Sequence, residues 1–185
     1  MSYSFSSKKL LVAIISGLSS MFIAPSVAVA DNLDSGVYVN LNAGAGGQLS
    51  LNNISGGLAG SVNVGYNFNP YLAVDAGFNS LGGIGVFGIS SSRIYALSAK
   101  ASLPLGNIFY LYGRLGLGYD NSTYTNVWDN TSEYNTAVTL MAAGAAFHLG
   151  KHFELHLEDS FFIPLNTQPP ASTTNMLQLG VQYNF

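Results

Sequence analysis

Four charged residues stand out in a chain in which only 8% of residues are charged. They are two acids and two bases, Asp75, Lys100, Arg114 and Glu158. Such a set can form buried ion pairs, because charges removed from water require partners. It can also form a gate whose ion pairs break and re-form to pass ions. The choice depends on the elements that hold the four side chains.

Two further groups of residues have the composition of reactive sites. His148, His152 and His156 are spaced by four, which would align three metal ligands on a helix but not on a strand. His156, Asp159 and Ser160 have the composition of a hydrolase triad. Along one strand, however, His156 and Ser160 would lie about 13 Å apart, beyond hydrogen-bond reach unless another strand supplies a partner. We therefore expect no catalytic residues, no metal and no cofactor.

The elements that carry these residues are predicted to be strands. Apolar and polar residues alternate with period two in eight segments, near 37–44, 58–68, 72–79, 95–103, 111–119, 135–149, 153–158 and 177–185. Within 135–149 the alternation does not decide which residues face inward and which face outward. Alternation also points Asp159 outward, so either a bulge reverses the phase there or Asp159 lies at an outer interface.

The connections between these segments alternate in length. Short turns are predicted at 69–70, 104–108 and 150–152, and longer loops at 46–55, 80–91, 120–133 and 163–173. Short periplasmic turns and long extracellular loops are typical of outer-membrane barrels. We therefore predict an all-β fold, an eight-stranded antiparallel up-and-down transmembrane β-barrel formed by residues 31–185.

Composition favours the same class of protein. The chain is 48% hydrophobic yet has little charge, where soluble domains have about 25% charged residues. It lacks cysteine, which excludes disulfides and cysteine metal sites. From residue 31 onward, four basic residues face nine acidic ones, a formal charge of −5. This balance argues against nucleic acid as a partner.

Residues 1–30 are predicted to be a signal peptide. Lys8 and Lys9 precede a mostly apolar stretch, and Ala28-Val29-Ala30 form a small-residue cleavage site. We therefore expect export through the periplasm to the bacterial outer membrane.

In such a barrel the four charged residues Asp75, Lys100, Arg114 and Glu158 would point inward. Counted from the nearest turns, they would lie roughly 10–15 Å above the periplasmic rim. Because side chains nearly fill an eight-stranded barrel, we expect an ion-pair network that plugs the lumen, with an ion-passing gate as the alternative. Nine aromatic residues near the turn side are predicted to form an interfacial girdle: Tyr66, Phe68, Tyr71, Phe109, Tyr110, Phe147, Phe153, Tyr183 and Phe185.

Several segments resemble a known family. The stretch from Gly65 to Phe78 is similar to the first periplasmic hairpin of OmpA/OmpX-like barrels, and Leu103-Pro104-Leu105 leading into Leu111–Tyr119 is also similar. The chain ends in alternating residues that resemble the signal read by the outer-membrane assembly machinery, Leu179, Val181, Tyr183 and Phe185. The resemblance covers essentially all of 31–185 and implies an eight-stranded barrel of the OmpA/OmpX or opacity-type surface class, without fixing one function.

The expected function is envelope integrity or surface interaction, such as adhesion or host-factor binding through extracellular loops. The residues expected to make loop contacts are Phe87, Tyr124 and Trp128. Expected partners are outer-membrane lipids and lipopolysaccharide, the assembly machinery, and a host-surface or extracellular protein. A narrow ion channel and a lipid-modifying outer-membrane enzyme are the alternatives.

Overall fold

The computed structural model describes residues 35–50, 53–85, 88–126, 131–166 and 172–185. The predicted signal peptide, Phe87 and Trp128 lie outside these residues, so those predictions remain predictions. Among the described residues, no helix is long and apolar enough to cross a membrane.

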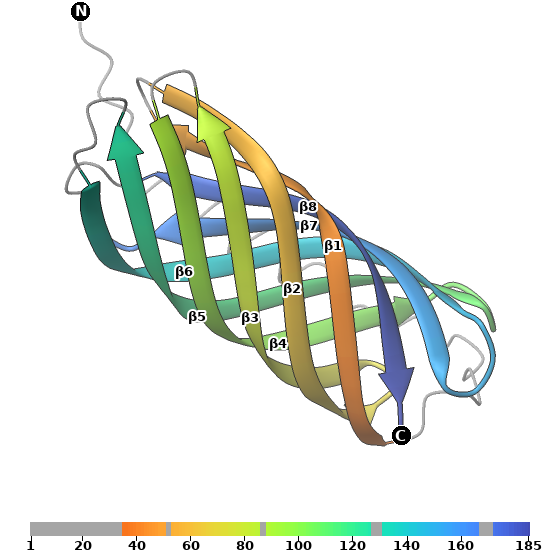
Figure 1. The fold of residues 1–185 in the computed structure, drawn as a ribbon. Helices are drawn as coiled ribbons and strands as arrows, with labels where there is room; N and C mark the ends of the chain where they lie inside the picture. Colours follow the sequence, from red (N-terminus) through yellow and green to blue (C-terminus); the bar gives the residue numbers. More distant parts are fainter. Residues whose placement is uncertain (1–34, 51–52, 86–87, 127–130, 167–171) are drawn as a thin grey trace, which may run out of the picture.

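Eight antiparallel strands form one closed barrel, as predicted. Their bounds are β1 Gly36–Ser50, β2 Asn53–Asn69, β3 Leu72–Gly85, β4 Gly88–Pro104, β5 Phe109–Asn126, β6 Thr131–His148, β7 Phe153–Pro164 and β8 Thr173–Asn184. Each strand pairs with its neighbours in the chain, and β8 closes the wall by pairing with β1. Figure 1 shows the end of β8 beside the start of β1.

The strands are strongly inclined to the barrel axis. The pairing that starts at Tyr38 and passes through all eight strands returns to β1 at Gln48, ten residues along the strand. With the usual spacings within and between strands, this stagger corresponds to a tilt of about 40°. A narrow, steeply wound barrel follows from the register alone.

The three predicted short turns are present, and local chemistry explains them. In the turn between β2 and β3, the backbone N–H groups of Tyr71 and Leu72 both donate to the Asn69 side chain. Gly106 and Gly150 have positive φ values of 118° and 115° in the other two turns. Glycine adopts such backbone angles without the steric penalty that a side chain would impose.

Three predicted extracellular loops were wrong for most of their length. Residues 46–50 and 53–55, 80–85 and 88–91, and 120–126 and 131–133 belong to paired strands. The strands therefore contain 12 to 18 residues, where about ten suffice to cross a bilayer. Apolar alternation fades in these segments because their outward faces no longer need to be apolar.

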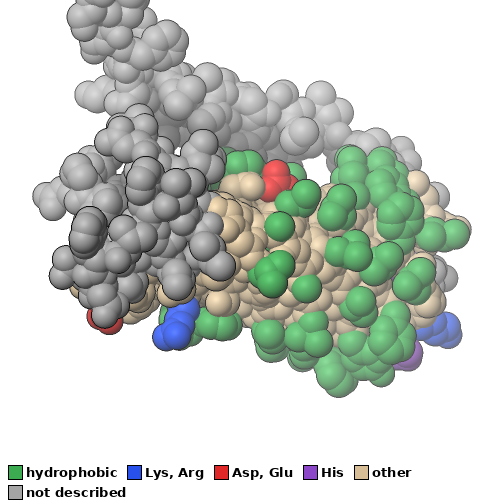
Figure 2. Space-filling model, turned by 45° about the horizontal axis from the view of Figure 1, so that its top comes forward, with side chains coloured by type: hydrophobic (Ala, Val, Ile, Leu, Met, Phe, Trp, Pro, Cys, Tyr) green, Lys and Arg blue, Asp and Glu red, His purple; other side chains and the backbone are tan. Residues whose placement is uncertain are grey.

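The wall separates apolar from polar residues as the alternation predicts. Figure 2 shows hydrophobic side chains spread over the outside of the barrel. The predicted girdle is exposed at Phe68, Phe153 and Phe185, but Tyr110 is only 3% exposed and points into the lumen. Including Tyr110 in the girdle was wrong, because it lies on the same face of β5 as Arg114.

Alternation continues unbroken through β7, so no bulge occurs near Asp159. Glu158 and Ser160 are buried, whereas Asp159 faces outward and accepts a hydrogen bond from Asn175 at 2.6 Å. Exposed apolar residues follow it on the same strand, at Phe161 and Ile163. The Asn175 side chain, on the neighbouring strand, therefore provides a hydrogen-bond donor for the Asp159 carboxylate on the apolar outer side of the wall.

Candidate functional site

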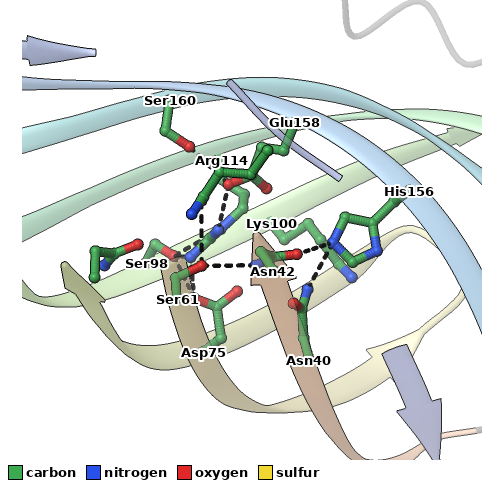
Figure 3. A network of polar contacts seen from close by, with 12 residues as sticks. Asn40, Asn42, Ser61, Asp75, Ser98, Lys100, Arg114, His156, Glu158 and Ser160 are labelled. Atoms are coloured by element: carbon green, nitrogen blue, oxygen red, sulfur yellow. Dashed lines mark hydrogen bonds and ion pairs between the residues drawn. The ribbon is translucent and has the colours of Figure 1, made fainter. Parts of the chain in front are cut away.

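The lumen contains a polar network centred on Arg114 of β5. The guanidinium Nη2 lies 2.6 Å from Asp75 Oδ1, and Nη1 lies 2.8 Å from Glu158 Oε1. Each of the three side chains is at most 5% exposed. Figure 3 shows Arg114 between Asp75 and Glu158, which come from β3 and β7. One cation therefore links three separate strands across the lumen.

Hydroxyl groups complete the coordination of the two carboxylates. Tyr38 donates to Asp75 Oδ2 at 2.9 Å, and Ser98 donates to Asp75 Oδ1 at 2.6 Å. Ser160 donates to Glu158 Oε1 at 2.7 Å. Charge-assisted hydrogen bonds of this kind are among the strongest in proteins. The network is thus well satisfied, as a stable buried ion pair requires.

Lys100 lies in the same lumen but makes different contacts. Its side chain is buried, and its Nζ donates to Gln182 Oε1 at 3.4 Å. The Nζ also lies 4.5 Å from the centre of the Tyr38 ring and 5.6 Å from that of Tyr112. Among the described residues, no carboxylate lies within ion-pair distance of Lys100. Cation–π contacts with the two tyrosine rings thus accompany the hydrogen bond to Gln182.

A second carboxylate centre lies nearer the periplasmic turns. Glu154 is fully buried and accepts hydrogen bonds from Tyr110 and from Asn184, and His148 Nδ1 lies 3.4 Å from it. Glu154 was not among the residues predicted for the lumen network, although it shares its strand face with His156 and Glu158. The alternation of residues in β7 was the sequence signal that could have identified Glu154, because it places Glu154 on the inward face of the strand.

The histidines and the triad-like residues do not assemble into reactive sites. His156 Nε2 contacts Asn40 and Asn42, as Figure 3 shows, while His152 lies exposed at a turn. Asp159 faces outward, away from His156 and Ser160. Within the described part of the chain, no three His, Cys, Asp or Glu residues are grouped to hold a metal ion.

Apolar side chains fill the lumen beyond the ion pairs. Toward the end opposite the short turns lies a cluster that we call the apolar plate, formed by Ala59, Leu81, Ile94, Ala96, Val138, Leu140, Phe162 and Met176. All of its members are at most 8% exposed. Below the plate, the residual cavity around Lys100 and Arg114 measures about 10 Å³. A cavity of that size holds about one water molecule.

The three residues expected to contact a partner are only partly described. Tyr124 lies in β5, where it pairs with Ser90 of β4 and Ser132 of β6. It therefore belongs to a paired strand rather than to a loop.

Residues 14–185 match the family model of the outer membrane protein beta-barrel domain. The chain belongs to this family. An outer-membrane barrel of this family resides in the bacterial outer membrane, where its apolar outer wall contacts lipid.

Known proteins of this kind share sequence or fold with the barrel. Outer membrane protein A of Klebsiella aerogenes is 29% identical over 166 residues, an alignment covering 82% of this chain and 44% of the relative. The chain thus spans less than half the length of this curated relative.

Two solved structures show the same fold at low identity. Neisserial surface protein A is 14% identical with a TM-score of 0.72, covering 82% of this chain and 98% of its own. Ail, the attachment invasion locus protein of Yersinia pestis, was solved with the heparin analogue sucrose octasulfate. It is 14% identical with a TM-score of 0.59, covering 83% of this chain and 100% of its own.

Proposed function

We propose that this outer-membrane barrel is a rigid, non-enzymatic anchor that binds an extracellular protein through the outer parts of β4, β5 and β6. The observation that carries the proposal is the length of these strands. They contain 17, 18 and 18 residues, whereas β7 and β8 contain 12 each. We call the part of them beyond Tyr95 and Tyr119 the outer extension.

The outer extension is a paired sheet with a polar composition. Its pairing continues from Ile94↔Asp120 to Gly88↔Asn126, and from Asp120↔Thr136 to Thr125↔Thr131. Its residues are mostly hydroxyl and amide types, which lipid would not favour. Among them Glu133, Tyr134 and Asn135 are exposed. A sheet of this kind would project from the membrane into the extracellular space.

One side of the outer extension is suited to pairing with another chain. Residues 132–136 of β6 pair with β5, but pairing with β7 begins only at Val138↔Pro164. Among the described residues, no strand lies on the other side of 132–136. A sheet edge without a neighbour can bind an extended segment through backbone hydrogen bonds. The segment also lacks the lysine and proline that often protect sheet edges.

The charge of the outer extension favours a protein partner over a polyanion. Ail was solved with a heparin analogue. Here the described part of the extension contains one basic residue, Arg93, against Asp120 and Glu133. A strongly anionic glycan would therefore find little electrostatic complementarity.

The lumen supports an anchor rather than a channel. The cavity around Lys100 and Arg114 leaves room for about one water molecule, and we propose that the ion-pair network and the apolar plate together plug the barrel. A lipid-modifying enzyme lacks support because His156, Asp159 and Ser160 do not converge.

The experiment is a binding assay with cells that display the full-length protein. A non-adherent strain would express wild type, the double variant Glu133→Gln/Tyr134→Ala, or Lys151→Gln as a control on a periplasmic turn. We expect wild type and the control to bind immobilised extracellular-matrix or serum proteins, and the double variant to bind several-fold less. Equal binding by all three strains and by empty-vector cells would contradict the proposal. Detergent sensitivity caused by deleting the protein would then favour a role in envelope integrity.

A further inference from the structure

A carboxylate interrupts the apolar outer face of β7. The other outward positions of this strand are apolar and at least partly exposed: Phe153, Leu155, Leu157, Phe161 and Ile163. Asp159 lies within this series, six residues beyond Phe153 of the exposed girdle. With the usual rise and tilt, it lies about 15 Å above Phe153, whereas the apolar band of such a barrel is about 25 Å tall. Asp159 therefore faces the hydrocarbon region of the membrane rather than one of its interfaces.

The hydrogen bonding of the Asp159 carboxylate is incomplete. Asn175 donates to its Oδ1 at 2.6 Å, and the same Asn175 amide also donates to the Ser160 carbonyl oxygen at 3.3 Å. Within the described part of the chain, no basic side chain lies within ion-pair distance of Asp159, and no donor contacts its Oδ2. Acyl chains have no donor to offer, and an ionisable group inside a membrane is costly unless it is partnered. Oδ2 therefore points to a contact with protein inside the membrane.

The outer wall is shallow on one side of Asp159 and raised on the other. A single row of the register runs across β4 to β8 through Ala101, Gly113, Ala143, Asp159 and Leu177. The first three of these residues have little or no side chain, and all three are exposed. On the other side, Leu177 is 51% exposed and Leu179 is 55% exposed. Small residues let two membrane proteins approach closely, and a polar group among them can hydrogen-bond across the contact.

We propose that this part of the wall, the Asp159 face formed by Gly113, Ala143, Asp159 and Leu177, binds a second copy of the chain. A two-fold axis along the membrane normal and close to Asp159 sets Leu177 of each copy over Ala143 of the other, so that raised and shallow parts fit reciprocally. The same axis brings the two Asp159 carboxyl groups together. They share one proton between their Oδ2 atoms, because adjacent carboxyl groups disfavour two negative charges. The contact lies inside the membrane, so it does not depend on the partner proposed for the outer extension.

Association in a bilayer tests the proposal directly. The full-length chain has no cysteine, so Lys151→Cys on a periplasmic turn can carry a donor or an acceptor dye. Energy transfer between copies would be measured in vesicles at increasing protein-to-lipid ratios, and we expect it to exceed the transfer caused by random proximity. Asp159→Leu in this background should weaken association about tenfold, the effect expected when a hydrogen bond inside a membrane is lost. Asp159→Asn keeps a neutral hydrogen-bonding group of the same size and should retain most of the association.

The shape of the contact has its own matched control. Ala143→Leu fills the shallow part of the Asp159 face and should weaken association, whereas Ala76→Leu makes the same change on the outer face of β3, four strands away from β7. A disulfide-linked dimer should form with Ala143→Cys and not with Ala76→Cys, and this result decides the matter if Ala143→Leu fails to form the heat-modifiable barrel. Energy transfer no greater than random proximity would overturn the proposal. Association of Asp159→Leu equal to that of the unchanged face, or equal effects of Ala143→Leu and Ala76→Leu, would also overturn it.

Discussion

The ring of Tyr112 occupies the space that a side chain at position 144 would need. The two residues face each other across β5 and β6, and a β-carbon built on Gly144 would come within 2.4 Å of the tyrosine ring. The same relationship links Tyr38 with Gly65. Bulky lumen side chains thus fit because the directly paired residue is glycine.

This pairing predicts that Gly144→Ala destabilises the barrel. The added methyl group must displace the Tyr112 ring or the nearby Leu157 carbonyl, and overpacking of this kind costs about 1–3 kcal/mol. Gly82→Ala is the control, because no atom lies within 4 Å of a β-carbon there. Urea unfolding of protein refolded in vesicles would measure both. Equal unfolding free energies for the two variants would refute the packing argument.

Removing Arg114 alone should destabilise the barrel much more than removing Arg114 together with its two carboxylate partners. Arg114→Met leaves Asp75 and Glu158 buried without an ion-pair partner, which typically costs about 3–5 kcal/mol. The triple variant Asp75→Asn/Arg114→Met/Glu158→Gln removes all three charges and should recover much of that loss. Both would be compared by urea unfolding in vesicles. A triple variant as unstable as the single one would show that the ion pairs are not the origin of the effect.

The ion-pair network and the apolar plate should each block the flow of ions through the lumen independently of the other. Arg114→Ala opens the polar network but leaves the apolar plate, and Phe162→Ala does the reverse. We expect steady single-channel conductance in planar bilayers only from the double variant. Conductance from wild type, or from Arg114→Ala alone, would favour the alternative prediction, a gate whose ion pairs open to pass ions.

The terminal residue should matter for assembly more than for stability. Phe185 is 73% exposed, and its backbone N–H donates to the Val37 carbonyl, so little of its side chain is packed. Deleting Phe185 is therefore expected to lower the folded, heat-modifiable fraction in cells several-fold, while refolding in vitro changes little. Phe153→Leu, on the same aromatic girdle, serves as the control. Equal losses in cells and in vitro would assign Phe185 a purely structural role.

The alternation of residues was sufficient to predict the fold. It gave the strand number, the short turns and the inward positions of Asp75, Lys100, Arg114 and Glu158, because lipid and lumen impose opposite chemistry on successive residues. The same logic fails outside the membrane, where both faces of a strand can be polar. The outer parts of β5 and β6 were therefore predicted as the loop 120–133.

Partner choice inside the lumen could not be predicted from strand phase. Phase and height indicated that two acids and two bases meet, but not that Arg114 binds both acids while Lys100 lies over tyrosine rings. Which groups make contact depends on how far each side chain extends into the lumen and on the stagger between the strands. The Asn175 partner of Asp159 was missed for the same reason, since it lies on a different strand.

The seam between β1 and β8 has a kinetic consequence. Its paired residues are far apart in the chain, and even the nearest pair, Leu49 and Thr173, is separated by 124 positions. Contacts between such distant residues form slowly, because a long chain must be ordered before they are made. Until that seam forms, β1 and β8 expose unpaired edges that can join other chains and aggregate. The two edges that close the barrel are therefore the last to be protected from such pairing during folding.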